Sequence, residues 1–323
     1  MKLITGQTEL LSAGLRPSAV TLGKFDGLHL GHRKLIGEVL KAKEEGLETV
    51  VFTFSIPPRA FTEREMQPIL LTRREKRAHM ERLGIGVLVE YPFTEAVCRM
   101  EPEDFVKQVL VRGLQVKRVV TGPDFCFGYR RRGDVELLSR LAAVYGYELT
   151  VIEKERDAKG RIISSTLVRE ELGLGHVEQA NELLGYPYTV TGEVVHGNHL
   201  GRTFGMPTIN QIPAKEKLLP PNGVYTAAIE IDGKIYRGVS NVGYKPTIEG
   251  DYPKGVETYI FDFNRDLYGK TLDVQLFHYQ RREQKFASVE KLKAQLVKDA
   301  RESRSFFERH PLADDGLCKK TEK

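Results

Sequence analysis

The segment Leu22-Gly23-Lys24-Phe25-Asp26-Gly27-Leu28-His29-Leu30-Gly31-His32 is the most informative part of the first half of this chain. An apolar run at residues 18–22 leads into it and predicts a buried strand. The residues after it, from Arg33 to Glu45, carry apolar side chains at helical spacing. The glycines let the backbone turn sharply between strand and helix, and the two histidines stand just before the expected helix. Free N–H groups and the positive end of the helix dipole would face the same place, which predicts a binding site for phosphate.

Strand-like and helix-like segments alternate as far as about residue 185. The expected strands are Ala19–Leu22, Thr49–Phe54, Gly86–Tyr91, Arg118–Thr121 and Glu148–Ile152. The expected helices are Arg33–Glu45, Arg73–Leu83, Pro102–Arg112, Asp134–Tyr145, Thr166–Leu172 and Val177–Leu184. This alternation predicts an α/β fold with a parallel sheet covered on both faces and ligands bound beyond the carboxyl ends of its strands.

The sequence pattern changes near Gly185. Short alternating runs separated by glycine then predict a small antiparallel barrel or sandwich, with runs at Tyr188–Val195, Val224–Ile231, Lys234–Val242, Glu257–Phe263 and Thr271–Gln280. Asp232-Gly233, between two of these runs, predicts a hairpin turn. A final amphipathic helix is expected from Ser288 to Glu308, with Ser288 as its N-cap. We therefore expect domains at residues 1–185 and 186–310 and a polar tail at 311–323.

Length and composition limit the class of protein. The 323 residues are enough for two domains, each with its own core. No apolar run is long enough to cross a bilayer, and the start does not read as a signal peptide. The odd number and wide spacing of Cys98, Cys126 and Cys318 exclude a disulfide framework and indicate a reducing cytoplasm. The net charge of +5 does not indicate a dedicated nucleic-acid binder, and Arg130–Arg132 fits a solvated loop as well as a phosphate contact.

Two later segments are expected at the same edge of the sheet as the histidines. Gly122–Gly128 follows a strand, and its Asp124 could hold a ribose hydroxyl, a base edge or magnesium, or could be an ordinary turn aspartate. Ile163–Arg169 opens a helix with a cluster of hydroxyls and carries an arginine on the first turn. That segment could clamp phosphate, or it could be a plain N-cap with an exposed arginine.

The second half contains a separate candidate site. The glycine-rich segment Gly197–Asn210 could wrap phosphates with its N–H groups, or it could be a structured turn. The side-chain oxygens of Thr208 and Asn210 suit magnesium, which prefers hard oxygen ligands. Glu257 is the one carboxylate in the run Val256–Ile260. It could orient and deprotonate a hydroxyl for phosphoryl transfer, or it could be an outward-facing strand residue.

The runs from Gly23 to His32 and from Ile163 to Arg169 resemble the adenylyltransferase module of bacterial bifunctional riboflavin kinase/FAD synthetases. The His-x-Gly-His element alone is shared by a broader nucleotidylyltransferase superfamily. The second half is similar to the riboflavin kinase signature of the same family. Its matching segments are Gly201-Arg202, Gly205, Pro207-Thr208-x-Asn210, Asn241-Val242-Gly243, Pro246-Thr247, Val256-Glu257-Thr258, Leu267-Tyr268-Gly269-Lys270 and Arg281-x-Glu283-x-Lys285-Phe286.

The resemblance implies a Rossmann-like FMN adenylyltransferase domain followed by a riboflavin kinase β-barrel with a C-terminal helix. It implies that ATP phosphorylates riboflavin to FMN, and that ATP then adenylylates FMN to FAD with release of pyrophosphate. Mg²⁺ would accompany the nucleotide. The implied partners are riboflavin, FMN and ATP, without nucleic acid or membrane.

The resemblance also implies roles for particular residues. His29 and His32 would stabilise the triphosphate and the leaving pyrophosphate, and Glu257 would be the base for the flavin's ribityl hydroxyl. Thr208 and Asn210 would bind the metal–nucleotide, and Arg281 and Glu283 would contact the flavin. The remaining nucleotide-binding residues would be Gly23, Phe25, Asp26, Gly31, Asp124, Ser165, Thr166, Arg169, Gly201, Arg202, Gly205 and Pro207.

Some positions depart from the family pattern, and other functions remain as alternatives. The departures are Pro123 before Asp124, Ile209 in place of a common alanine, Tyr259 in place of a frequent histidine, and Gln280 in place of a common leucine. They affect the expected affinity more than the chemistry, because no reactive group is lost. The alternatives are a nucleotidyltransferase with another phosphate acceptor, a flavin-binding regulator without activity, and a nucleic-acid module.

Overall fold

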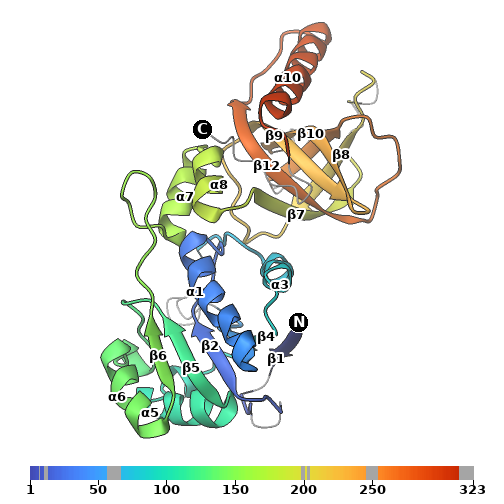
Figure 1. Ribbon diagram of the computed structural model, residues 1–323. Coiled ribbons are helices and arrows are strands. Elements are labelled where there is room, and N and C mark those ends of the chain that lie inside the picture. Colours follow the sequence, from blue (N-terminus) through green and yellow to red (C-terminus); the bar gives the residue numbers. More distant parts are fainter. Residues whose placement is uncertain are drawn as a thin grey trace. The chain divides into compact units, whose positions relative to one another are not determined.

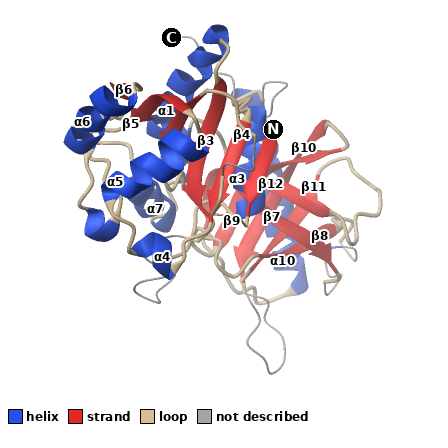
Figure 2. Cartoon of the chain, turned by 90° about the horizontal axis from the view of Figure 1, so that it is seen from below, coloured by secondary structure: helices blue, strands red, loops and turns tan. Residues whose placement is uncertain are grey.

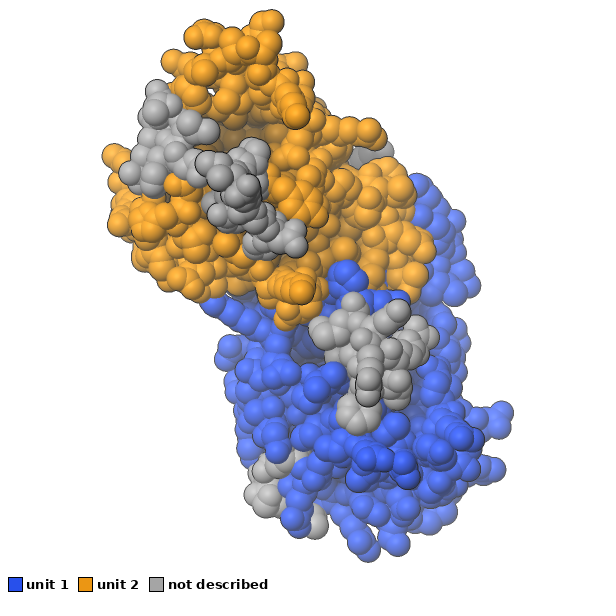
Figure 3. All heavy atoms as spheres, turned by 180° about the vertical axis from the view of Figure 1, so that it is seen from behind, with its two compact units in different colours: residues 1–165 blue, residues 166–323 orange. Residues whose placement is uncertain are grey.

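The computed structural model describes residues 1–6, 8–10, 14–56, 67–197, 201, 204–244 and 254–312. The chain forms two compact units, residues 1–165 and 166–323, which are coloured separately in Figure 3. Helix α8 (Val177–Leu184) belongs to the second unit because it packs on barrel strands. The boundary between the two units therefore lies before α8, whereas the change in sequence pattern lies after it.

A parallel sheet forms the centre of the first unit, as predicted (Figures 1 and 2). Its order is β1-β4-β3-β2-β5-β6, and the strands are β1 (Lys2–Thr5), β2 (Ser18–Leu22), β3 (Glu48–Phe54), β4 (Val87–Tyr91), β5 (Val116–Thr121) and β6 (Glu148–Val151). All five neighbouring pairs are parallel. Strand β1 was not predicted, because it is a short edge strand in which only Ile4 is buried.

Helices cover both faces of this sheet. On one face, Val20 and Leu22 of β2 share a large apolar cluster with residues of the segments between β4 and β6. On the other face, Ala19 packs with Val39 and Ala42, which follow β2 in the chain. Successive residues of β2 point to opposite faces and all five are buried, which is typical of a central strand in a parallel sheet.

Within the described residues, the helices of the first unit lie close to the predicted ranges, except for the short helix Glu95–Cys98, which was not predicted. They are α1 (Leu30–Lys41), α3 (Arg73–Arg82), α4 (Glu95–Cys98), α5 (Pro102–Asp104) and α6 (Val135–Tyr145), with 3₁₀ turns at Ala42–Glu45 and Tyr129–Arg131 and a π-helix at Phe105–Gly113. The start of α1 corrects the prediction. The helix begins at Leu30 rather than Arg33, so that His29 is its N-cap and His32 lies in its first turn.

The order of the strands places the loop after β2 at a special position. From β2 the chain moves outward through β3 and β4 on one side, and it returns to add β5 and β6 on the other side. The direction of winding therefore reverses between β2 and β5. Ligands of open α/β sheets bind at such a switch point, beyond the carboxyl ends of the strands. The loop with the histidines and the loop with Asp124 both begin there.

The second unit contains a closed antiparallel barrel, as predicted. Its order is β10-β11-β8-β7-β12-β9, and the strands are β7 (Tyr188–Val195), β8 (Thr208–Pro213), β9 (Gly223–Ile231), β10 (Lys234–Gly243), β11 (Gly255–Ile260) and β12 (Thr271–Arg281). The predicted hairpin turn is confirmed, since Asp232 and Gly233 adopt φ of 52° and 76° between β9 and β10. Strand β8 was not predicted, and it places Thr208 and Asn210 on a strand rather than in the expected loop.

The helices of the second unit that lie within the described residues include α7 (Ser165–Gly173), which begins at the boundary of the two units, α8 and the long α10 (Val289–Arg309). Helix α10 packs on the outer face of β9 and β10. Ser288 caps it, as predicted, because its hydroxyl accepts a hydrogen bond from the Lys291 amide. The contact between Ala300 of α10 and Val224 and Val239 shows that these two strand residues lie on the outer face.

Candidate active sites

The two histidines form a stacked pair in the first unit. Their ring centroids are 3.7 Å apart and the ring planes differ by 21°. Burial lowers the pKa of His29 to about 4, and it lowers the pKa of His32 well below 6.5, with a further contribution from His29. Both imidazoles are therefore neutral at pH 7. The Nδ1 atoms of both rings are buried and have no hydrogen-bond partner among the described residues.

The loop before the histidines is held in an unusual backbone conformation. Phe25, Gly27 and Leu28 all have positive φ, of 48°, 81° and 40°. Phe25 is fully buried, and the centroid of its ring lies 5.2 Å from that of the His32 ring. A Cβ atom at Gly23 would lie 3.2 Å from the Phe25 ring, so glycine leaves room for that ring. Strain of this kind is common where a loop positions reactive groups.

Two segments that are far apart in the sequence meet beside the histidines. The Ser165 hydroxyl donates a hydrogen bond of 2.7 Å to the Asp26 carbonyl oxygen. The carboxylate oxygen Oδ1 of Asp26 accepts the amides of Leu70 and Leu71, at 3.0 and 3.2 Å. Asp26 thus contacts a neighbouring loop through its side chain and Ser165, the last residue of the first unit, through its carbonyl oxygen. The structure brings the Gly23–His32 and Ile163–Ser165 segments together, as the sequence analysis expected.

The other expected residues of this site differ in their surroundings. Asp124 is largely exposed and forms a 2.8 Å ion pair with Lys154, whose hydrogen bond lowers the pKa of the Asp124 carboxyl. Thr166 and Arg169 lie in α7, within the second unit. Arg132 of the basic triplet forms an ion pair with Glu101, so that its charge is offset within the protein.

The barrel gathers three oxygen-bearing side chains on one face. Asn210 of β8 lies directly opposite Glu257 of β11 in the sheet register, and Thr208 lies two residues along β8 on the same face. The Thr208 hydroxyl donates a 2.6 Å hydrogen bond to the Glu257 carboxylate. Glu257 also lies opposite Asn241 of β10, which in turn lies opposite Val224 on the outer face. The three side chains therefore lie on the outside of the barrel.

The segment before β8 is a compact turn. The Gly201 carbonyl oxygen accepts the amides of Phe204 and Met206, at 3.1 and 2.9 Å. A Cβ atom at Gly201 would lie 2.3 Å from the Met206 carbonyl oxygen, and Gly205 has φ of 73°, so glycine is required at both positions. Pro207 directly precedes β8. Arg202 lies outside the described residues.

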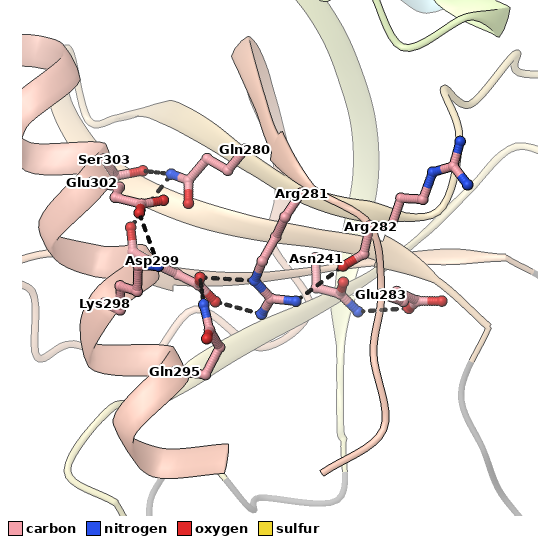
Figure 4. A network of polar contacts seen from close by, with 10 residues as sticks. All are labelled: Asn241, Gln280, Arg281, Arg282, Glu283, Gln295, Lys298, Asp299, Glu302 and Ser303. Atoms are coloured by element: carbon pink, nitrogen blue, oxygen red, sulfur yellow. Dashed lines mark hydrogen bonds and ion pairs between the residues drawn. The ribbon is translucent and has the colours of Figure 1, made fainter. Parts of the chain in front are cut away.

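Arg281 and Glu283 occupy a polar network between the end of β12 and neighbouring elements (Figure 4). The Arg281 guanidinium donates to both carboxylate oxygens of Asp299 in α10, at 2.8 and 2.6 Å, and Asp299 is 1% exposed. The Glu283 carboxylate accepts hydrogen bonds of 3.1 Å from the amides of Asn241 and Asn222. Because Asn241 is also opposite Glu257, this network places Glu283 near the carboxylate of the barrel site.

One charged residue beside the histidines was missed by the sequence analysis. Lys76 of α3 is half-buried, and its Nζ donates a 2.8 Å hydrogen bond to the Lys24 carbonyl oxygen in the loop after β2. Its charge is close enough to contribute to the lowered pKa of His32. The signal in the sequence was the basic run Arg73–Arg77, in which positions i, i+3 and i+4 share one helical face.

Sequence comparisons identify the family. Residues 12–167 match the FAD synthetase family model, and residues 184–307 match the riboflavin kinase family model. The bifunctional riboflavin kinase/FMN adenylyltransferase of Listeria monocytogenes is 36% identical over 89% of this chain and 92% of its own length. The chain belongs to this family. The bifunctional riboflavin kinase/FMN adenylyltransferase of Escherichia coli is also 36% identical, over 95% of this chain and 98% of its own length.

A solved structure has the same fold over nearly the whole chain. The crystal structure of a Streptococcus pneumoniae protein described as a macrolide-efflux protein superposes with a TM-score of 0.81 and 32% sequence identity. It covers 92% of this chain and 97% of its own length. Within the described residues, no helix has the length and apolar character needed to span a bilayer. The family, the fold class and the bifunctional enzyme class predicted from the sequence are thus confirmed.

Proposed function

We propose that the histidine site of the first unit transfers AMP from ATP to FMN. The observation that carries this proposal is the stacked pair of buried, neutral imidazoles at the N-terminus of α1. A neutral imidazole donates one hydrogen bond, and the helix N-terminus adds backbone N–H groups, so that a phosphate chain would be bound without a protonated histidine. The nucleophile would be the phosphate of FMN, already an anion, and the site therefore needs no general base. Positioning and stabilisation of the leaving pyrophosphate would then supply the catalysis.

The residues around this pair would have supporting roles. Gly23 and Phe25 would shape the pocket, since the Phe25 ring packs beside His32. Asp26 would fix the loop through the Leu70 and Leu71 amides rather than bind the nucleotide with its carboxylate. Thr166 and Arg169 would add a hydroxyl and a guanidinium to the phosphate contacts.

The barrel site would phosphorylate riboflavin. Glu257 would accept the proton of the ribityl hydroxyl as that oxygen attacks the terminal phosphate of ATP. Its carboxylate is oriented by the 2.6 Å hydrogen bond from Thr208. The turn from Gly201 to Pro207 would wrap the nucleotide phosphates. Glu283, two residues after the end of β12, would contact the flavin. Arg281 would hold the end of β12 to α10 through its ion pair with Asp299.

The oxygen donors at the barrel site fit Mg²⁺ that arrives with ATP. Thr208 and Asn210 offer a hydroxyl and an amide oxygen on the same face as Glu257, and these are ligands that Mg²⁺ accepts. The described residues contain no cluster of three or more His, Cys, Asp or Glu side chains that would hold a metal ion by itself. Mg²⁺ usually keeps several waters and binds through one or two protein ligands and the phosphates, which suits this set. Bound there, it would neutralise charge on the transferring phosphate.

We also propose the domain limits 1–185 for adenylyl transfer and 186–310 for kinase activity, followed by the polar tail 311–323. The family matches at residues 12–167 and 184–307 support this division. A cytoplasmic location is proposed because Cys98 and Cys126 are free thiols, which fits a reducing compartment.

Reciprocal variants test the two assignments in the full chain. Glu257→Gln should lower FMN formation from riboflavin at least about 100-fold, the usual size of a general-base contribution, and should leave FAD formation from supplied FMN unchanged. His32→Ala should give the opposite pattern. Glu193→Gln is the matched control, because Glu193 is an exposed glutamate on another barrel strand.

The two outcomes that contradict the proposal are distinct. An unimpaired kinase in Glu257→Gln would show that the base is elsewhere. Loss of FMN formation in His32→Ala, with FAD formation intact, would overturn the division of the two activities between the two sites. A screen of FMN against pantetheine phosphate and nicotinate mononucleotide as AMP acceptors tests the alternative of another nucleotidyltransferase.

A further inference from the structure

Helix α3 lies across the carboxyl edge of the sheet and contacts three successive strand ends with one face. Arg77 donates to the carboxylate of Glu90 in β4 at 2.9 and 2.6 Å. Arg73 donates to the Ser55 carbonyl oxygen, directly after β3, at 2.8 Å. Lys76 donates to the Lys24 carbonyl oxygen, two residues after β2. Because residues at positions i, i+3 and i+4 of a helix share one face, each of these three basic residues contacts a different strand end.

The charges on this face are not all neutralised. Glu90 is 2% exposed and is shared by Arg77 and Arg73, which lie 2.6 and 3.8 Å from its Oε2. Lys76 has no carboxylate within ion-pair distance among the described residues, and its one hydrogen bond is to the Lys24 carbonyl oxygen. A half-buried ammonium has three N–H groups and needs further acceptors. Two donors of Lys76 are thus available beside the loop that carries the histidines.

The two imidazoles of the histidine site supply no positive charge. Both rings are neutral at pH 7, whereas ATP and pyrophosphate are polyanions. We propose that Lys76 is a phosphate-binding residue of the adenylyltransferase site, where its ammonium binds an oxygen of the ATP polyphosphate chain and of the leaving pyrophosphate. The proposal rests on the assignment of adenylyl transfer to this site. Lys76 reaches the loop of residues 23–29 from α3, so this positive charge comes from a helix outside the Gly23–His32 segment.

The environment of the amine is consistent with this role. Burial lowers the pKa of Lys76 below that of a free lysine. The groups that face it are Asp26 and Glu90, which favour its charged form, and Arg73 and His32, which do not. A bound phosphate would add the missing negative partner and raise the pKa of Lys76 again.

The test compares Lys76→Gln with Lys43→Gln in the full chain. Lys43 is the matched control because its Nζ also donates to a backbone carbonyl, that of Gly84, before β4 and away from the motif loop. Lys76→Gln should lower kcat/KM for Mg–ATP in FAD formation at least tenfold and weaken inhibition by pyrophosphate at least tenfold. The KM for FMN and the rate of FMN formation from riboflavin should change less than twofold. Lys43→Gln should leave all four quantities unchanged.

Two results would overturn the proposal. Unchanged Mg–ATP and pyrophosphate constants in Lys76→Gln would show that Lys76 does not bind phosphate. An equal rise in the KM for FMN would show that Lys76 only supports the loop. A wild-type protein that forms no FAD would instead refute the assignment of adenylyl transfer, and the two failures are therefore distinguishable.

The pH dependence of pyrophosphate affinity distinguishes a role for the charge of Lys76 from a purely structural role of its side chain. In the wild type, affinity for pyrophosphate should fall at alkaline pH as Lys76 loses its proton, and Lys76→Arg should move that fall to higher pH, because arginine stays protonated. A neutral lysine amine still donates to the Lys24 carbonyl oxygen, so a purely structural role would give no such fall. The same alkaline fall in Lys76→Arg would contradict the proposal.

Discussion

Acidification from pH 7 to pH 5 should destabilise the first unit through the buried His29. The pKa of His29 is about 4 in the folded chain and about 6.5 when the chain is unfolded. Between these two values the unfolded state binds more protons than the folded state, so the free energy of unfolding falls as the pH falls. The loss begins near pH 6.5 and is complete near pH 4. It would reach about 2 kcal/mol at pH 5 and about 3 kcal/mol at pH 4.

The assay combines an NMR titration with urea unfolding. The Cε1–H resonance of His29 reports its pKa directly, and it should move below pH 5. In urea, the wild type should lose about 2 kcal/mol more stability between pH 7 and pH 5 than His29→Gln does, because glutamine does not titrate. Comparing the two proteins cancels the contribution of carboxylates that both share.

Two results would refute this reasoning. A measured pKa of His29 above 6 would mean that the stacked pair is solvated in solution. An equal loss of stability in the wild type and His29→Gln would mean that other groups cause the pH dependence. Either result would also remove the argument that the histidines act as neutral hydrogen-bond donors.

Two further substitutions test the packing around the sites. Arg281→Met should lower the free energy of unfolding of the second unit by about 3–5 kcal/mol, because it leaves the Asp299 carboxylate buried and unpaired, and Arg281→Met/Asp299→Leu should recover most of that loss in urea unfolding. Gly31→Ala should reduce FAD formation about tenfold or more, because the added Cβ would lie 3.2 Å from the His29 ring and displace it. Gly37→Ala is the control in the same helix, since its Cβ would meet no atom within 4 Å, and it should add up to about 1 kcal/mol of stability without loss of activity. Equal activities in the two alanine variants would contradict the role of Gly31.

The order of elements was predictable from the sequence, because long periodic segments determine strand and helix type. The errors occur where local signals are weak. Strand β8 follows a glycine-rich segment that suggested a loop, and its strand structure follows from pairing with β7 and β11, of which β11 is distant in the sequence. The start of α1 was not predicted, because Gly31 is a poor helix former and its presence in the first turn argued against a helix there.

The site contacts were less predictable than the elements, since they depend on topology. The hydrogen bond between Ser165 and Asp26 joins residues 139 positions apart and follows from the placement of both loops at one edge of the sheet. The contact of Lys76 with the loop after β2 depends on the path of α3 across three strand ends. The residues of the histidine motif could be recognised in the sequence. The charged residue that supports them, Lys76, lies in a helix that carries no recognisable motif.

The two proposed sites differ in whether they contain a general base, and this difference follows from the nucleophile of each reaction. In adenylyl transfer the attacking group is a phosphate that is already anionic, so a base would add nothing, and a carboxylate would repel both substrates. The histidine site accordingly has neutral imidazoles and the proposed Lys76 ammonium, and the carboxylate of Asp26 in the same loop accepts hydrogen bonds from backbone amides. In riboflavin phosphorylation the attacking group is a neutral hydroxyl that must lose a proton. The proposed barrel site accordingly contains the carboxylate of Glu257, which accepts a hydrogen bond from Thr208 and lies opposite Asn210 and Asn241 in the sheet register.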